Sequence, residues 1–290
     1  MIAAILRLVR PKQWIKGLLV FAGPLFAGQV ASAPAMSRAG VAFAAITAAS
    51  AATYVVNDLI DAPRDRKHPR KQHRPIASGE VPPLVASLIA GGCLGLAIGL
   101  AVSLNAASVG WVTAYLGIQL LYNLMLKHEP VADAFCLASG FVVRAALGAA
   151  AIAVTISGWL LFCTAALSLM LAFGKRRHEF REMGDDRGAT RASLAKYSAP
   201  FLDFAVVVCA AAAAMSYGLY SIESPTAVQH PLLIATSIWV AFAIFRYLHL
   251  TFGPDADERA GEPEFIFLTD RPMILSVLGF LATALFALSR

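Results

Sequence analysis

The chain has 290 residues, of which 58% are hydrophobic and 14% charged, and its mean hydropathy is +0.67. These values exclude an ordinary soluble protein of one or two domains, because soluble chains are far less apolar. The 24 Lys and Arg residues outnumber the 18 Asp and Glu residues, which gives a net charge of +6. The composition therefore predicts an integral membrane protein with basic segments outside the bilayer.

Nine segments have the length and apolar composition of a transmembrane helix, which needs about 17 to 25 residues. They fill most of the chain, so we expect residues 1–290 to form a single all-α membrane domain, a bundle of nine transmembrane helices. The four cysteines all fall within these segments and show no spacing typical of a metal site, which favours a packing role. The predicted spans are 16–34, 39–56, 83–103, 106–125, 131–152, 156–174, 200–221, 231–251 and 272–288.

Residues 1–14 precede the first span and resemble a short interfacial helix. Apolar residues recur there at helical spacing, opposite Arg7 and Arg10, and Trp14 marks the membrane interface. The segment has no small-residue cleavage site, so we expect no removable signal peptide. The apolar face consists of Ile2, Ile5, Leu6 and Val9.

The basic residues predict the orientation of the chain. Most of them lie at the N-terminus or in the loops after the even-numbered spans, while Arg38 and Arg290 fall on the other side. Since positive charge is retained in the cytoplasm, we expect a cytoplasmic N-terminus and an external C-terminus in the plasma membrane. The basic residues are divided among short loops without interleaved aromatics, so we expect anionic lipid and phosphorylated substrates as partners and no nucleic acid.

The strongest motif follows the second span, at the start of a predicted cytoplasmic active-site loop, 57–82. Asn57, Asp61 and Asp65 are spaced by four residues and would line one face of a helix, with Asp58 three residues before Asp61. Carboxylate and amide oxygens suit Mg²⁺, which is usually held by a few carboxylates together with substrate phosphates and water. These four residues are therefore the predicted metal ligands.

Pro63 interrupts this ladder, because a proline lacks the amide hydrogen of the helical bond. We expect the helix to kink or end near Ala62, which makes Asp65 the weakest predicted ligand. The alternative is a solvated helix end balanced by nearby Arg and Lys. Four ligand-type groups within nine residues would repel each other without a cation, so the metal site is favoured.

A second cytoplasmic active-site loop is predicted at 175–199, four spans after the first. Lys175, Arg176 and Arg177 are suited to gripping phosphate, and the alternative for each is simple positive-inside anchoring. The four-span offset suggests two four-helix halves plus a ninth helix, and the two loops would close over one cavity.

Charged residues also occur inside or beside the middle spans. Arg144 lies deep in the fifth span, where a charge normally faces a polar cavity or a partner. A direct pair with Asp133 is excluded, because eleven residues separate the two by about 16 Å along one helix. Arg246 lies near the cytoplasmic half of the eighth span, where we expect a structural role.

The residues described so far resemble the UbiA-type prenyltransferase superfamily. Its first signature, Asn-Asp-x-x-Asp-x-x-x-Asp, is matched by Asn57, Asp58, Asp61 and Asp65. Four further stretches resemble its decaprenyl-phosphate phosphoribosyltransferase branch, and the resemblance covers nearly the whole chain. These stretches are 10–16, 73–79, 122–127 and 175–179.

The resemblance implies transfer of phosphoribosyl from 5-phosphoribosyl 1-diphosphate to a polyprenyl (decaprenyl) phosphate, with Mg²⁺ as cofactor, for synthesis of an arabinose donor for the cell envelope. Superfamily members usually carry a second aspartate-rich motif after the sixth span, where this chain has Lys175, Arg176 and Arg177. The replacement of acidic residues by these three basic residues fits a donor with an additional phosphate. The resemblance also makes a homo-oligomer, a trimer, a family-level expectation.

In the predicted mechanism the metal cluster holds the departing diphosphate and the acceptor phosphate attacks the anomeric carbon, so no protein nucleophile is needed. Asp58, Asp61, Tyr122 and Lys127 are the predicted catalytic group, and Tyr122 and Lys127 would position phosphate. Lys12, Gln13 and Lys16 would receive the acceptor head group. The remaining predicted substrate-binding residues are Arg66, Arg74, Asp133, Arg144, Lys175, Arg176, Arg177 and Glu179.

Two other functions remain open from the sequence. A prenyl diphosphate transferase acting on an aromatic or other small acceptor would share the Mg²⁺ site but should show a second carboxylate ladder, for which Glu182 and Asp186 offer an imperfect substitute. A cation or phosphate transporter should cluster its binding groups near the bilayer midplane, whereas here only Arg144 lies deep.

Overall fold

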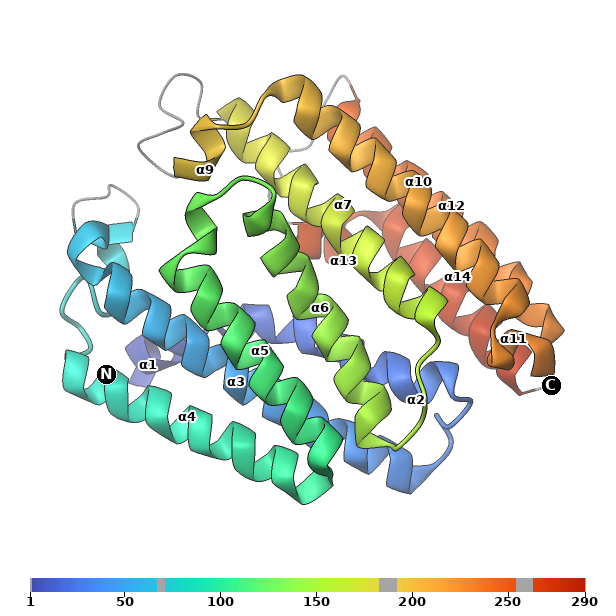
Figure 1. Cartoon of the computed structure of the whole chain (residues 1–290), viewed down its shortest axis with the longest axis horizontal. Coiled ribbons are helices and arrows are strands. Elements are labelled where there is room, and N and C mark those ends of the chain that lie inside the picture. Colours follow the sequence, from blue (N-terminus) through green and yellow to red (C-terminus); the bar gives the residue numbers. More distant parts are fainter. Residues whose placement is uncertain (1, 67–70, 183–191, 254–262, 290) are drawn as a thin grey trace.

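The computed structural model describes residues 2–66, 71–182, 192–253 and 263–289, and within these ranges it contains helices and no strands (Figure 1). The all-α prediction is confirmed. The elements are α1 (Ile2–Val9), η1 (Pro11–Phe21), α2 (Ala22–Phe26), α3 (Ala33–Asp65), η2 (Lys71–His73), α4 (Pro83–Leu104), α5 (Ala106–Leu124), η3 (Leu126–His128), α6 (Ala132–Ala151), α7 (Gly158–Glu182), α9 (Ala192–Ala195), α10 (Ala199–Glu223), α11 (Pro225–Gln229), η5 (Pro231–Thr236), α12 (Ser237–Phe252), α13 (Pro263–Thr269) and α14 (Arg271–Leu288).

Seven helical segments among the described residues are long and apolar enough to cross a membrane. They are α3, α4, α6, α7, α10, η5 with α12, and α14. α5 has 19 residues and packs against both α4 and α6, and its length of about 28 Å is also that of a span. The chain is a multi-pass membrane protein, while the count of nine spans and the placement of the termini remain predictions.

Residues 16–34 do not form the single helix that we predicted. The segment is a 3₁₀ helix, η1, followed by the short α2 and a turn before α3. Both elements press against the backbone of α6: a Cβ on Gly148 would lie 1.9 Å from the Val20 carbonyl oxygen, and one on Gly23 would lie 2.5 Å from the Gly148 carbonyl carbon. This backbone contact, which composition does not reveal, and Pro24 within α2 explain the broken span.

The two largest hydrophobic clusters among the described residues divide the bundle. One is formed by η1 with α3, α4, α5 and α6, around Ile46, Tyr115 and Leu147. The other is formed mainly by α7, α10, α12 and α14, around Phe173 and Tyr247. Figure 1 shows these groups as two adjoining sets of helices, with α6 and α7 side by side at their junction. The division differs from the predicted four-helix halves at α6, the fifth predicted span, which contributes Val143, Leu147 and Ala151 to the first core.

The N-terminal helix α1 buries its small face inside the protein. Ala4 and Leu8 pack with Val55 and Ala62 of α3 and with Ile76, while Leu6 stays exposed. Arg7 forms an ion pair with Glu80. The predicted helix is therefore present, but it docks on the end of α3 as well as facing outward.

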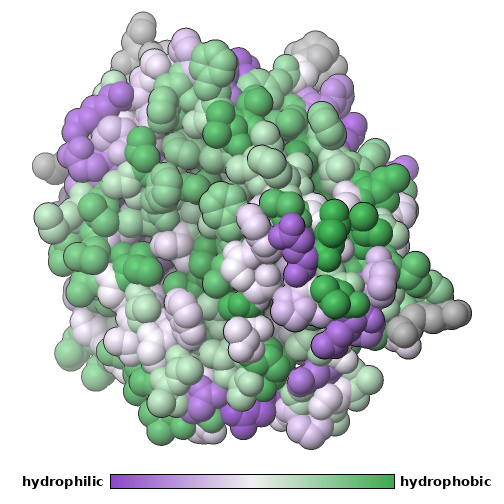
Figure 2. All heavy atoms as spheres, turned by 45° about the vertical axis from the view of Figure 1, so that its right-hand side comes forward, coloured by the Kyte–Doolittle hydropathy of each residue, from purple (hydrophilic) through white to green (hydrophobic). Residues whose placement is uncertain are grey.

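The outer surface carries many exposed large apolar side chains. Leu84 and Leu88 on α4, Phe204 on α10 and Phe245 on α12 are each more than two-thirds exposed. Figure 2 shows a face on which apolar side chains cover most of the area and hydrophilic ones gather in smaller patches. Such a surface is expected for helices solvated by lipid.

Candidate active site

The predicted acidic ladder occupies the last turns of α3. The helix runs without a break through Pro63 to Asp65, and the Arg66 amide still bonds the Ala62 carbonyl, so the expected helix end near Ala62 is wrong. Pro63 is exposed and removes only one amide from the helical pattern, which the surrounding bonds tolerate. Asp65 consequently lies on the same helix as Asp58, and both are buried.

Two arginines bind this pair of carboxylates. The Arg74 guanidinium lies between them and donates to Asp58 Oδ1 at 3.1 Å and to Asp65 Oδ2 at 2.8 Å. Arg10 donates to the same Asp58 oxygen at 2.6 Å and lies over the Tyr54 ring, 4.9 Å from its centroid. The segments before and after α3 therefore converge on its C-terminal end.

The third carboxylate has a different partner. Asp61 Oδ1 accepts a hydrogen bond from Lys127 Nζ at 2.8 Å, so η3, between α5 and α6, reaches the same end of α3. Three carboxylates thus face three cations, which balances the charge of a partly buried cluster. Arg74 and Lys127 are among the predicted site residues, whereas Arg10 is not; its signal in the sequence is that it begins the 10–16 stretch that resembles the branch.

The donor set fits a hard cation. One oxygen of each of Asp58, Asp61 and Asp65 has no hydrogen-bond or ion-pair partner among the described residues, and the Asn57 amide lies on the same helical turn. The described residues do not, however, gather three or more such side chains around one point. Mg²⁺ commonly takes one or two carboxylates and completes its shell with phosphate oxygens and water, so the arrangement remains suitable.

The basic cluster after the sixth predicted span lies on the end of α7 and is largely buried. Arg176 is 1% exposed and donates from Nε to Asp133 Oδ2 at 2.6 Å and from Nη1 to Glu179 at 2.7 Å. Arg177 donates from Nε to Asp203 at 2.5 Å and from Nη1 to the Thr251 carbonyl at 2.6 Å. These two arginines join α7 to α6, α10 and α12.

Lys175 differs from its two neighbours. Its side chain is partly exposed and has no hydrogen-bond or ion-pair partner among the residues that the structure describes. Tyr122, at the end of α5, lies within electrostatic range of Arg176. The structure thus brings Tyr122, Lys127, Asp133 and Arg176 to the end of the bundle where the acidic ladder lies.

Arg144 lies deeper than these groups and is 5% exposed. Its guanidinium donates to the Gly140 carbonyl at 2.6 Å, to Ser50 Oγ at 2.9 Å and to the Tyr115 hydroxyl at 3.2 Å. Ser50 precedes Asp58 by eight residues, which places this cluster about 12 Å deeper along α3. Arg144 therefore joins three helices, and its role in substrate binding stays a prediction.

The other predicted acceptor-site residues lie near Arg10. Lys12, Gln13 and Lys16 are all on η1, where Lys12 is exposed and the other two are partly buried. Arg66 follows the end of α3 and is exposed. Arg246, for which we expected a structural role, binds both carboxylate oxygens of Asp270 at 3.1 and 2.8 Å and thereby links α12 to α14.

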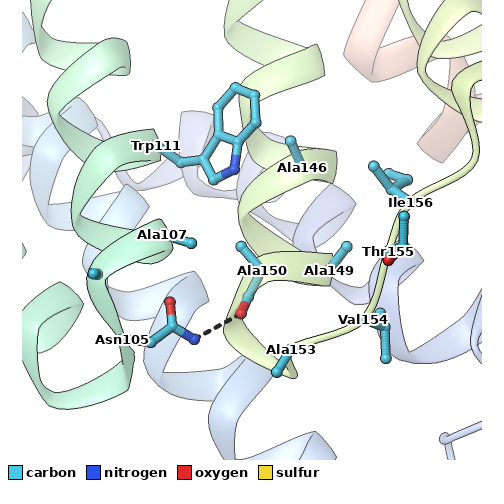
Figure 3. Close-up of a pocket in the computed structure, with 11 residues that line it drawn as sticks. Asn105, Ala107, Trp111, Ala146, Ala149, Ala150, Ala153, Val154, Thr155 and Ile156 are labelled. Carbon is cyan, nitrogen blue, oxygen red and sulfur yellow. Dashed lines mark hydrogen bonds between the residues drawn. The ribbon is translucent and has the colours of Figure 1, made fainter.

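An open pocket of about 490 Å³ lies at the opposite end of the bundle (Figure 3). It is lined by the start of α5, the end of α6 and the segment that leads to α7, including Trp111, Ala153 and Ile156. Asn105 donates to the Ala150 carbonyl at 2.7 Å and closes one side. The pocket has no charged side chain in its lining, and it is distinct from the charged site.

The family model described as the UbiA prenyltransferase family matches residues 18–269. This chain belongs to the UbiA prenyltransferase family. The family member from Mycobacterium tuberculosis named decaprenyl-phosphate phosphoribosyltransferase is 35% identical over 98% of this chain and 93% of its own length. A protein of the same name from Corynebacterium glutamicum is 33% identical over 94% of this chain and 82% of its own length. The family and branch resemblance inferred from the sequence is confirmed.

Solved UbiA structures share the fold. A UbiA homolog from Archaeoglobus fulgidus bound to GPP and Mg²⁺ has a TM-score of 0.70 at 20% identity and covers 99% of this chain and 100% of its own. A digeranylgeranylglyceryl phosphate synthase has a TM-score of 0.68 at 17% identity, with 98% and 99% covered. The match over both whole chains establishes the UbiA fold for this protein.

Proposed function

We propose that this UbiA-family protein transfers the 5-phosphoribosyl group of 5-phosphoribosyl 1-diphosphate to a polyprenyl phosphate such as decaprenyl phosphate and releases pyrophosphate. The observation that carries the proposal is the cluster at the end of α3, where Asp58, Asp61 and Asp65 meet Arg10, Arg74 and Lys127. A site with both charges can hold a metal and the phosphates bound to it. The relatives that align over nearly the whole chain are named for this reaction.

Mg²⁺, when bound, would neutralise the charge that develops on the departing pyrophosphate. Asp58, Asp61 and Asp65 would hold the ion through the oxygens that bind no cation in the present arrangement, assisted by the Asn57 amide. Solved relatives bound to Mg²⁺ support a divalent metal in this fold.

The cations of the cluster would also bind the phosphates of the donor. Arg10, Arg74 and Lys127 would bind phosphate oxygens of the donor at the same place, because guanidinium and ammonium groups bind phosphate well. Tyr122 and Lys175 would complete the donor site from α5 and α7. Asp133 and Glu179 would contribute indirectly, by holding Arg176 in place. Arg144 and Arg177 would contribute positive charge to the donor site, Arg144 from a deeper position and Arg177 from its ion pair with Asp203.

The acceptor is an ionised phosphate on a lipid, so it needs positioning more than activation. Lys12, Gln13 and Lys16 on η1 are the proposed head-group contacts, because η1 begins directly after Arg10, which binds Asp58 of the cluster. Arg66, exposed after α3, is a further proposed phosphate contact. The acceptor phosphate attacks the anomeric carbon as the bond to pyrophosphate breaks.

The proposed location is the plasma membrane with this site facing the cytoplasm, where phosphorylated sugars are made. Basic residues gathered at the site end of the helices support that orientation. The product would supply arabinose units to the cell envelope. Assembly as a homo-oligomer, a trimer by family expectation, is part of the proposal and can be measured by mass photometry in detergent.

The direct test supplies purified protein with radiolabelled 5-phosphoribosyl 1-diphosphate and decaprenyl phosphate. We expect a labelled lipid product with Mg²⁺ and none after chelation with EDTA, with activity restored when Mg²⁺ is added back. A parallel reaction with a prenyl diphosphate and an aromatic acceptor tests the rival function. Product in that reaction alone would reject the phosphoribosyl assignment.

The metal role is tested at Asp61, which pairs with Lys127 and with no other cation among the described residues. Replacing Asp61 with Ala should lower kcat/KM by at least about a hundredfold, the size typical of losing a charge-stabilising group. The Lys127→Ala variant should raise the donor KM instead, because it keeps the metal ligands. Near-normal turnover in a properly folded Asp61→Ala protein would contradict the metal role.

A further inference from the structure

The turn that leads into α6 has an unusual backbone. Val131 has φ 66° and ψ −53°, and the Ala132 amide bonds the Pro130 carbonyl at 2.7 Å. These values define a γ-turn of the rare, strained type, here with a β-branched residue at its centre. Such a conformation persists only where the surroundings hold it.

The Val131 side chain does not hold the turn in this conformation, since it is 39% exposed. The turn is held through its backbone, because the Val131 amide donates to the Tyr197 hydroxyl at 2.6 Å. The same hydroxyl donates to Asp133 Oδ1 at 2.7 Å. One side chain from the second cytoplasmic loop therefore binds both sides of the turn.

Tyr197 is itself rigidly placed. It is 7% exposed, and its ring stacks on Phe201 with centroids 5.7 Å apart. Burial, with Asp133 beside the hydroxyl, raises the pKa of Tyr197 well above its usual value, so the group stays protonated and can donate. Asp133 is fully buried and is also bound by Arg176 and Ser193, which fixes the acceptor.

The strained turn follows directly after η3, which carries Lys127 to Asp61. A residue that fixes the turn also fixes where η3 lies, because only three residues separate His128 from Ala132. The short helix α9, just before Tyr197, packs on η3 and strengthens the link (Figure 1).

We propose that Tyr197 is a positioning residue, whose hydroxyl holds the strained turn at Val131 and so keeps Lys127 beside Asp61 at the donor phosphates. The role of Lys127 in this inference rests on the proposed function. The ordering of residues 125–133 by the Tyr197 hydroxyl does not depend on the proposed function. The second cytoplasmic loop thereby shapes the first active-site cluster without touching substrate.

The test compares Tyr197→Phe with two controls. Phenylalanine keeps the stacking on Phe201 and removes only the hydroxyl. Lys196→Ala removes an exposed ion pair to Glu129 between the same two loops, and exposed pairs contribute little. Tyr217→Phe removes a buried tyrosine hydroxyl that bonds Thr236 in the other part of the bundle.

Tyr197→Phe should raise the KM for 5-phosphoribosyl 1-diphosphate about tenfold, the effect of losing one hydrogen bond to a charged group, and leave the acceptor KM unchanged. Hydrogen exchange of amides 125–133 should become about tenfold faster in the same variant. Both controls should match the wild type. Adding Val131→Gly, which adopts positive φ without strain, should restore the donor KM to within about threefold.

Unchanged exchange of residues 125–133 in Tyr197→Phe would overturn the proposal, and so would a fall in kcat with the donor KM unaltered. Failure of Val131→Gly to restore the donor KM would also reject it. If Tyr197→Phe does not accumulate, the double variant is expected to fold, and its failure to do so counts against the assignment. If the wild type shows no transfer at all, the proposed function fails while the exchange result still decides the structural claim.

Discussion

Gly174 is the last residue before the basic cluster of α7, and its missing side chain makes room for the Tyr247 side chain of α12. A Cβ at this position would lie 2.0 Å from the Tyr247 hydroxyl oxygen of α12. Tyr247 is fully buried and has no room to move away without disturbing its neighbours. The place of the Tyr247 side chain against α7, beside Lys175, therefore depends on glycine.

Replacing Gly174 with Ala should destabilise the protein by about 1 to 3 kcal/mol, because it overpacks a dense contact. Adding Tyr247→Phe should recover part of that loss, since it removes the nearest atom. Thermal unfolding in detergent measures both effects. Gly218→Ala, where a Cβ would meet nothing within 4 Å, is the matched control, and an equal loss there would contradict the explanation.

The end of α7 shows how one helix separates neighbouring residues into different roles. Successive residues of a helix point about 100° apart, so Lys175, Arg176 and Arg177 face three directions. Arg176 faces Asp133 on α6, Arg177 faces Asp203 on α10, and Lys175 is left partly exposed. A continuous basic run therefore contains two buried cross-links and one cation available to a ligand.

Arg176→Ala should lower stability by about 3 to 5 kcal/mol, because it leaves Asp133 buried without its cation. Lys175→Ala should leave stability unchanged and raise the donor KM. Thermal unfolding and steady-state kinetics on the same preparations separate the two results. Arg181 is exposed on α7, one turn after Arg177, so Arg181→Ala is the control for the loss of one positive charge. A large stability loss in Lys175→Ala would contradict this division of roles.

The charged site forms where the two helical groups meet at one end of the bundle. The ends of α3, α5 and α7 and the start of α6 all lie there, while the apolar pocket near Asn105 lies at the other end. Arg38, the predicted external arginine, donates at that other end to the carbonyls of Ala151 and Leu104. The molecule is therefore polarised along its helices, as a site on one membrane face requires.

The orientation can be measured with single cysteines in a background lacking the four native ones. An impermeant maleimide added to intact cells should label Ser103→Cys, at the end of α4, and should label Ala195→Cys, in α9, only after permeabilisation. Both positions are exposed, so reactivity reports sidedness. The reverse pattern would place the site outside the cell.

Local sequence patterns determined the class of the molecule and the acidic ladder. Apolar runs identify membrane helices because every backbone group in lipid must bond within its own helix. The four-residue spacing of Asn57, Asp61 and Asp65 predicts a shared helix face for the same local reason. One local rule failed at Pro63, because the neighbouring turns of α3 carry the helix across it.

Only the tertiary structure decided which charges meet. The binding of Asp58 by Arg10 and Arg74, of Asp61 by Lys127 and of Asp133 by Arg176 joins segments far apart in the chain, and no periodicity records such distances. The broken first span and the turn at Val131 likewise depend on contacts with Gly148 and Tyr197. Composition and spacing predict what each helix carries, whereas the packing of helices selects the partner of every charge.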